Sequence, residues 1–364
     1  MNIKNMIAYN LVGMTLCINA SVVSNVNVSN RYPWNGMVDI RFNLGQDAAV
    51  SLTAKDKVGN TNLAMRTLSE AGVMIQNGLT SLPKGDRHVV WNAATDYPNV
   101  VFEDVEILVT VDEELYMVIS LTKSGDKYPV SYLAGVPKSG WPIEYKTKSL
   151  VLRKIKAGSF TIGSPESEWG RNNNEAQSRQ TIAKDFYIGI YEVTFGQLWK
   201  VIAHNSSNYG WSPEYPAIEG GKAETFVSTL RTGSGLSVSL PTHIQWEYAC
   251  RAGTTTALYT GKNPADKYEL RIELAGRENF NDGGAFDRQI QRFGGDPTVV
   301  GSFLPNPWGL YDMYGNRGEL CADGVCKGGS SHSDDKTARS AYRGTSTPSN
   351  HSSDYLGFRI VVNQ

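Results

Sequence analysis

The sequence has no excess of charge of either sign, few cysteines and histidines, and no long apolar run. Its 35 basic and 36 acidic residues leave a net charge of −1, which gives no bulk attraction to nucleic acid or to anionic membranes. No stretch stays apolar for the roughly 20 residues that a membrane span needs. The five histidines share no metal-ligand spacing, and no glycine-rich phosphate loop follows a strand pattern. These absences argue against nucleic-acid partners and membrane spans.

The first 20 residues resemble a weak secretory signal peptide. Lys4 supplies a basic flank, residues 6–18 are mostly apolar, and Ala20 ends a small-residue cleavage pattern. A poorly ordered N-terminus or a first strand is the competing interpretation. The pattern predicts a signal peptide over 1–20 and an exported protein, periplasmic or extracellular, that loses Cys17 on cleavage.

Short alternating runs separated by turn residues fill residues 21–131. Examples are 37–44, 87–93 and 115–121, where apolar and polar residues alternate and β-branched residues are frequent. Alternation with a period of two predicts strands that have one buried face. Many short strands at this spacing are typical of an antiparallel sandwich. We therefore expect an immunoglobulin-like β-sandwich domain over 21–131.

A passage rich in proline, glycine and serine over 132–149 is interpreted as a linker, and a second domain extends over 150–364. Apolar residues at helical spacing, with cap residues or glycine stops, predict helices over 194–204, 221–235 and 242–253. The rest of this domain has the composition of loops and short strands. The whole chain is therefore expected to be an α+β protein, a β-sandwich followed by a loop-rich domain.

Six ordered blocks of the second domain carry a resemblance to a known family. They are LRKIKAGSFTIGS (152–164), DFYIGIYEVTFGQLWKVI (185–202), LPTHIQWEYACRAGTTT (240–256), VGSFLPNPWGLYDMYGN (300–316), KGGSS (327–331) and YLGFRIV (355–361). In these blocks the domain is similar to the formylglycine-generating enzymes, the sulfatase-modifying factor family. The resemblance implies a variant of the C-type-lectin fold and does not extend to the first domain.

The resemblance also implies a chemistry, which this sequence does not support. The family oxidises a substrate cysteine with copper(I) and molecular oxygen, and two cysteines follow its Gly-Gly-Ser hairpin. Soft thiolates select Cu(I), whereas a hydroxyl or carboxylate does not replace them. No cysteine follows Gly328-Gly329-Ser330 here, and Ser330 and Ser333 occupy the family's hairpin positions. The sequence therefore predicts a member that lacks the catalytic cysteine pair.

Cys321 and Cys326 lie five positions apart, before the hairpin rather than after it. The four residues between them can turn through Gly324. A short-loop disulfide is the expected state in an exported protein, while two free thiols and a metal-binding pair remain open. No Cys-x-x-Cys and no histidine at ligand spacing accompanies the pair, so a zinc site is not expected.

The family resemblance implies calcium in the loop that follows the Gly-Leu-Tyr motif. The matching positions are Asp312 and Glu319, through their side chains, and Gly315 and Arg317, through their carbonyl oxygens. Hard oxygen ligands drawn from one loop suit Ca²⁺. A capped, solvated acidic turn is the competing interpretation. A second family site near Asn279 aligns poorly.

A non-catalytic, exported binding protein with the sandwich as a spacer is the expected function. Its ligand would be a protein, peptide or glycan held by the C-terminal hairpin region, which is rich in residues suited to adaptable contacts. The candidate ligand-binding residues are His332, Asp334, Asp335, Tyr342, His351 and Tyr355. The alternatives are a formylglycine-generating oxidase that recruits Cys321 and Cys326 with copper, a variable ligand-binding protein of the retroelement-diversified type, and a decayed paralogue with a structural role.

Overall fold

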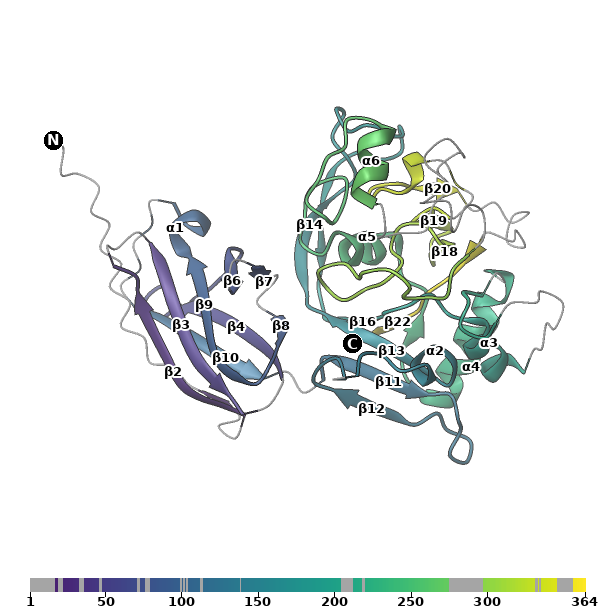
Figure 1. Cartoon of the computed structure of the whole chain (residues 1–364), viewed down its shortest axis with the longest axis horizontal. Coiled ribbons are helices and arrows are strands. Elements are labelled where there is room, and N and C mark those ends of the chain that lie inside the picture. Colours follow the sequence, from purple (N-terminus) through teal and green to yellow (C-terminus); the bar gives the residue numbers. More distant parts are fainter. Residues whose placement is uncertain are drawn as a thin grey trace. The chain divides into compact units, whose positions relative to one another are not determined.

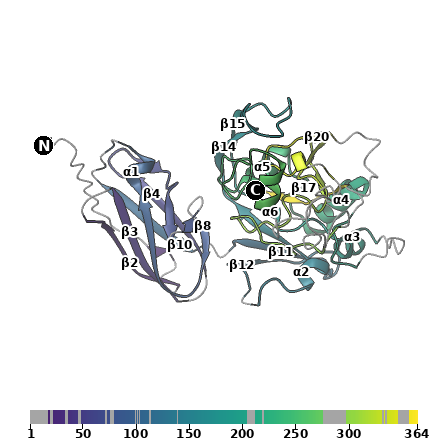
Figure 2. The ribbon, with the colours of Figure 1, turned by 45° about the horizontal axis from the view of Figure 1, so that its top comes forward.

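The computed structural model describes residues 17–18, 22–32, 36–45, 48–70, 73–75, 79–98, 100, 102, 104–111, 114–137, 139–203, 212–217, 220–274, 297–330, 333, 335–345 and 356–364. The chain divides into two compact units, which Figures 1 and 2 show as ribbons. The first comprises Met1–Leu115 and Tyr132–Lys138, and the second comprises Tyr116–Ser131 and Ser139–Gln364. Most of the predicted signal peptide lies outside the described residues.

The first unit consists of two β-sheets that share one hydrophobic core. One sheet has the strand order β1-β10-β4-β5, with β8 also paired to β4, and the other has the order β2-β3-β9-β6-β7. Trp91 and Ile40 are fully buried in the core between them. The elements are β1 (Cys17–Ile18), β2 (Val23–Asn30), β3 (Met37–Leu44), β4 (Ala48–Asp56), β5 (Thr61–Leu63), β6 (Leu68–Glu70), β7 (Val73–Ile75), β8 (Leu79–Leu82), β9 (Gly85–Asn92), α1 (Ala93–Asp96) and β10 (Val105–Val111).

Two predictions on the first unit can be compared directly with these strands. The runs 37–44 and 87–93 form β3 and most of β9, as their alternation indicated. Residues 17 and 18, inside the predicted signal peptide, pair in parallel with β10 as strand β1. All other strand pairs of the unit are antiparallel.

Asp39 is a buried acid on β3 that ties three strands together. Arg31, just after β2, donates two hydrogen bonds to its carboxylate, with N···O distances of 3.2 and 2.5 Å. His88 of β9 contacts the same carboxylate at 2.6 Å. The hydrogen bonds from Arg31, reinforced by His88, outweigh the opposing effect of burial and lower the pKa of Asp39 to about 2.

The second unit is built on a six-stranded sheet, with the order β12-β11-β13-β16-β22-β17, and on two smaller sheets, β14-β15 and β20-β19-β18-β21. Its strands are β11 (Tyr116–Ser120), β12 (Val130–Leu133), β13 (Ser149–Ile155), β14 (Gly158–Ile162), β15 (Ser178–Ile182), β16 (Phe186–Gly189), β17 (Val238–Ser239), β18 (Gly318–Leu320), β19 (Val325–Lys327), β20 (Gly344–Thr345), β21 (Leu356–Gly357) and β22 (Val361–Asn363).

The predicted end of the first domain at residue 131 is wrong. The run 115–121 was assigned to the sandwich, but β11 pairs along its whole length with β13 in the sheet of the second unit. Residues 116–119 are all buried, so the strand has no solvent-facing side. The predicted linker 132–149 is not free of structure either, since it contains α2 (Glu144–Thr147) and the first residue of β13.

The three predicted helices are confirmed, and sequence patterns located their ends well. They are α3 (Phe195–Ile202), α4 (Ala223–Ser234) and α5 (His243–Arg251). Thr194 and Thr242 form capping boxes at α3 and α5, in which each threonine and a glutamine three residues later satisfy each other's backbone N–H groups. Helices α3 and α4 lie side by side in Figures 1 and 2. A further helix, α6 (Lys267–Leu274), was not predicted.

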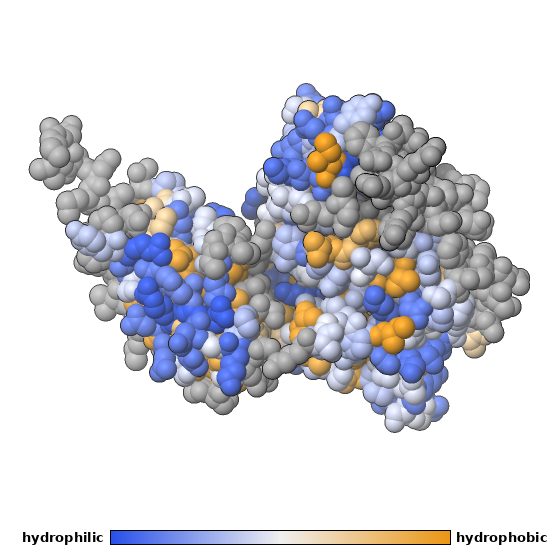
Figure 3. All heavy atoms as spheres, viewed as in Figure 1, coloured by the Kyte–Doolittle hydropathy of each residue, from blue (hydrophilic) through white to orange (hydrophobic). Residues whose placement is uncertain are grey.

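The surface in view in Figure 3 is mainly hydrophilic, with hydrophobic residues in small separate groups. Such scattered apolar exposure is ordinary for a folded protein. Among the described residues, no helix is both long and apolar enough to cross a bilayer.

Replacing Asp39 with asparagine is expected to cost stability in a pH-dependent way. Because the folded-state pKa of Asp39 is depressed, its contribution is fully present above the unfolded-state pKa and is lost as pH falls through about 2. Urea unfolding of the full chain should show D39N less stable than the parent at pH 7, with a difference that shrinks between pH 4 and pH 2. An equal difference at both ends of this range would contradict the assignment.

Candidate functional site

The Gly328-Gly329-Ser330 turn follows directly on β19. Gly328 and Gly329 both have left-handed backbone conformations, with φ of +80° and +71°. A Cβ atom on Gly329 would lie 2.2 Å from the Thr337 hydroxyl oxygen, so a side chain does not fit there. The backbone of this turn therefore requires glycine, as in the family motif, regardless of which residues follow it.

Ser330 and Ser333 are brought together by this turn. Their hydroxyl oxygens lie 2.9 Å apart, and the Ser330 N–H donates to the Ser333 hydroxyl at 2.9 Å. The Ser333 N–H donates in return to the Ser330 carbonyl. The two family hairpin positions thus form a local serine turn, whose hard hydroxyl oxygens are poor ligands for Cu(I).

The expected disulfide between Cys321 and Cys326 is not formed, and both thiols are free. The hairpin register explains this, since Cys326 lies directly opposite Leu320 rather than Cys321. Leu320 and Cys326 pack against the same hydrophobic core. Burial raises the pKa of Cys326 to about 12 and the pKa of Cys321 well above its ordinary value. Raised pKa values disfavour the thiolate form that binds metals and attacks disulfides, and Cys321 is also buried whereas Cys326 is half-buried.

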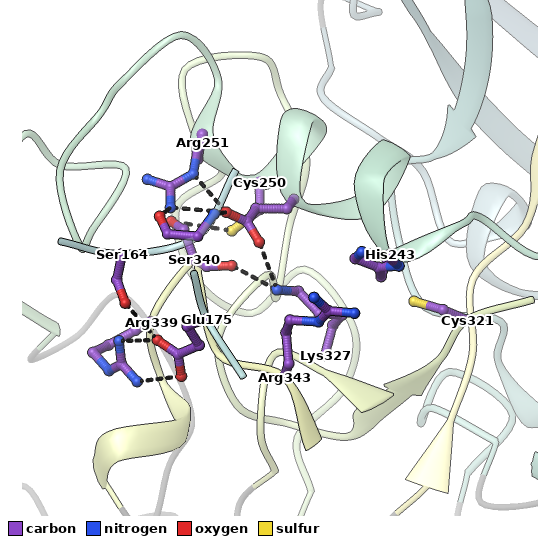
Figure 4. A network of polar contacts seen from close by, with 12 residues as sticks. Ser164, Glu175, His243, Cys250, Arg251, Cys321, Lys327, Arg339, Ser340 and Arg343 are labelled. Carbon is purple, nitrogen blue, oxygen red and sulfur yellow. Dashed lines mark hydrogen bonds and ion pairs between the residues drawn. The ribbon is translucent and has the colours of Figure 1, made fainter. Parts of the chain in front are cut away.

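Two groups of buried ion pairs, which the sequence analysis did not identify, stabilise the surroundings of the Gly328-Gly329-Ser330 turn (Figure 4). Glu247 on α5 accepts hydrogen bonds from Arg251 at 2.8 Å and from Lys327 at 3.0 Å, and Lys327 also donates to the Ser340 carbonyl at 2.9 Å. Burial alone would raise the pKa of Glu247, but the charges of Lys327 and Arg251 outweigh it and lower that pKa. Cys321 lies apart from the dashed contacts in Figure 4.

The second group centres on Arg339, which is almost fully buried. Its guanidinium donates to both Glu175 carboxylate oxygens, at 2.9 and 3.0 Å, and also pairs with Glu168. Asp335 is held in a similar way by two hydrogen bonds from Arg271 on α6, at 2.8 and 2.9 Å. The segment from Asp335 to Arg339 is therefore anchored at both ends by charge-assisted hydrogen bonds, which are the stronger kind.

The predicted calcium loop begins at Asp312 and ends on β18 at Glu319. Asp312 is buried, its Oδ2 accepts the Gly301 N–H at 2.7 Å, and its Oδ1 has no hydrogen-bond partner among the described residues. Burial raises the pKa of Asp312 to about 6, although the bond from Gly301 opposes this. An orphaned buried carboxylate oxygen is costly unless a cation or a proton meets it.

Glu319 has other partners. Its Oε1 and Oε2 each accept a hydrogen bond from Arg359 at 2.6 Å, and Oε2 also accepts the Trp246 indole N–H at 2.7 Å. A carboxylate offers about four lone-pair positions, so three of them are occupied. Glu319 is thus first a partner of Arg359 and has at most one lone pair left for a metal.

Glu192, which the sequence did not single out, also contacts this loop. It is fully buried, and its carboxylate accepts the Arg317 N–H at 2.8 Å and the Asn316 side-chain amide at 2.7 Å. Burial, with the charges of Asp312 and Glu319, raises its pKa well above the ordinary value. In the sequence, Glu192 stands out only as the first residue of Glu-Val-Thr in the block 185–202. That position does not indicate a contact with a loop more than 120 residues away along the chain.

The donor chemistry of the loop fits a hard cation through Asp312. Its free buried carboxylate oxygen is the kind of hard ligand that Ca²⁺ sites use. No group of three acidic, histidine or cysteine side chains with metal-ligand geometry occurs within the described parts of the chain. A calcium ion would therefore rely on Asp312 and on main-chain carbonyls, which the family resemblance places at Gly315 and Arg317.

The predicted ligand-binding residues are only partly described. Asp335 is buried against Arg271, so it is an anchor rather than an exposed contact. Tyr342 is half-buried, with its hydroxyl near Gly344. The predicted residues outside the described part of the chain are His332, Asp334, His351 and Tyr355, together with Asn279 of the second calcium site.

Comparison with solved structures gives matches of similar extent. PvdO from Pseudomonas aeruginosa is 23% identical, with a TM-score of 0.48, and the match covers 59% of this chain and 95% of that one. Variable protein 1 of Treponema denticola is 18% identical, with a TM-score of 0.47, and the match covers 59% and 96%. CarF is 19% identical, with a TM-score of 0.43, over 59% and 98%.

Curated relatives are similar over a shorter part. Two proteins described as serine/threonine-protein kinase pkn1, from Chlamydia pneumoniae and Chlamydia caviae, are 26% and 32% identical over 190 residues. The chain spans 27% of their length, and 46% of this chain is covered. The sequence profile of the sulfatase-modifying factor enzyme 1-like domain matches residues 145–364, well over half of the chain. The protein therefore belongs to the sulfatase-modifying factor (formylglycine-generating enzyme-like) family.

Proposed function

We propose that this protein is an exported, non-catalytic binding protein built on the family's scaffold. The observation that carries the proposal is the Ser330–Ser333 turn, which occupies the hairpin positions where the enzymes have copper-binding thiols. The two thiols nearby are those of the buried Cys321 and the half-buried Cys326, and their raised pKa values disfavour the thiolate that copper(I) would need. The chain thus keeps the fold but has no thiolate pair in the described hairpin.

The C-terminal hairpin region is the proposed ligand-binding surface. Its framework is rigid, since Asp335 and Arg339 are held by buried ion pairs to α6 and to the 164–175 segment. Residues 331–355 are rich in serine and also carry aspartate, histidine and tyrosine, which give adaptable hydrogen bonds and rigid aromatic contact. A firm frame that carries such residues supports recognition of a peptide or glycan.

The first unit is proposed to be an immunoglobulin-like spacer that follows a cleaved signal peptide. Support comes from its two sheets around one core and from the apolar segment near the N-terminus. A variant of the same proposal is that the binding surface is diversified by a retroelement. The composition of residues 331–355 supports this variant.

Calcium is proposed as a structural ion of the 312–319 loop. Asp312 would contribute its free Oδ1, with the carbonyls of Gly315 and Arg317, and Glu319 would add its remaining lone pair. The ion would neutralise buried negative charge and so stabilise the loop beneath the hairpin.

A copper assay tests the absence of oxidase chemistry. The reduced protein should not compete with a colorimetric chelator for Cu(I) and should not convert a cysteine-containing sulfatase peptide to the aldehyde. The reason is that the raised pKa values of Cys321 and Cys326 disfavour their thiolate forms. The C321S/C326S double variant is the control and should behave like the parent. Copper binding or peptide oxidation that disappears in the double variant would establish the enzyme instead.

A binding assay tests the proposed surface. The labelled protein should be retained on an array of bacterial-surface glycans and peptides, and the H332A/H351A variant should lose at least tenfold in affinity for whichever probe is retained. The matched control is H88A, which removes a half-exposed histidine from the first unit. Equal retention of the parent and H332A/H351A would refute the assigned surface.

Thermal unfolding with and without calcium tests the ion. Ligand at about 100 times its dissociation constant stabilises a folded state by about 2.7 kcal/mol, so Ca²⁺ should raise the Tm of the parent protein. D312N should show no such rise, yet in chelator it should be at least as stable as the parent, since it removes a buried orphaned charge. E175Q, which alters a buried acid outside the loop, should keep the calcium response. A parent Tm that does not change with calcium would contradict the proposed calcium site.

A further inference from the structure

Glu192 is a buried acid that holds the middle of the 312–319 loop from outside it. It lies between β16 and α3, and no part of its side chain is exposed. One carboxylate oxygen accepts the Arg317 backbone N–H at 2.8 Å, and the other accepts the Asn316 side-chain amide at 2.7 Å. A single side chain therefore fixes both the backbone and a side chain of the loop.

These bonds hold the peptide between Asn316 and Arg317 in one orientation. Asn316 has a left-handed backbone conformation, with φ of +53°, which a residue other than glycine adopts at some cost. Its side-chain oxygen accepts the Thr298 N–H at 3.0 Å, so the amide is fixed on both sides. The peptide groups on either side of this one carry the Gly315 and Arg317 carbonyls, whose directions depend on it.

Glu192 differs from the acids within the loop in what its hydrogen bonds hold. Both of its carboxylate oxygens accept hydrogen bonds from loop groups. Both oxygens of Glu319 instead accept from Arg359, and Asp312 accepts the Gly301 N–H. Glu192 is thus the acid whose hydrogen bonds fix the backbone between Asn316 and Arg317.

We infer that Glu192 is a positioning residue for calcium. It does not coordinate the ion, but it orients the loop carbonyls through its hydrogen bonds to Asn316 and Arg317. This inference rests on the calcium proposal above. Groups that orient the ligands of a metal typically change its affinity by about 10–100-fold when they are mutated.

Calorimetric titration with Ca²⁺ tests the inference on three folded proteins, the parent, E192Q and E175Q. E192Q should bind calcium about 10–100-fold more weakly than the parent, because an amide nitrogen cannot accept one of the two hydrogen bonds that Glu192 receives from the loop. E175Q loses a buried acid of comparable burial that is hydrogen-bonded to Arg339 and Ser164, outside the loop, and should bind like the parent.

Conservative replacement separates positioning from a merely structural role. E192D keeps both acceptor oxygens but has a shorter reach, so its calcium affinity should lie between those of E192Q and the parent. It also supplies the measurement if E192Q does not fold. Equal calcium affinity in the parent and in the folded Glu192 variants would overturn the inference while leaving the calcium site intact. A parent protein that binds no calcium would instead remove the calcium proposal on which the inference rests.

Discussion

The buried ion pair between Arg359 and Glu319 is the interaction on which the second unit depends. The guanidinium bonds both carboxylate oxygens of Glu319 on β18 and also donates to the carbonyls of Gly189 on β16 and Tyr311 before the loop. One side chain thus joins the central sheet, the C-terminal sheet and the loop. Loss of one partner of such a pair typically costs about 3–5 kcal/mol, because the other charge stays buried.

This constraint organises the candidate sites around it. With Glu319 committed to Arg359 and Trp246, the free oxygen for a cation is on Asp312, and Glu192 shapes the intervening residues. Lys327, the last residue of β19, pairs with Glu247 and so connects the hairpin to α5. The family scaffold therefore persists through buried charge pairing, even though the catalytic thiols are missing.

Much of the fold follows from local patterns in the sequence. Thr194 and Thr242 with the glutamines three residues later marked two helix starts, and the alternating run at 37–44 marked a strand. The predicted domain boundary at residue 131 is wrong because β11 is apolar on both faces. An apolar strand has the same local sequence pattern in either unit. Partner choice in a sheet is set by contacts distant along the chain, which local periodicity does not encode.

The sequence by itself determined the family, the absence of cysteines after Gly329 and the acids available to a cation, because residue identity alone fixes which chemistry is possible. Only the tertiary structure decided how those groups are used. The strand register places Cys326 opposite Leu320 and leaves both thiols free. The packing of Arg359 against β18 makes Glu319 its ion-pair partner. These outcomes depend on distances and burial between residues far apart in the chain, and those exist only once the sheets have packed.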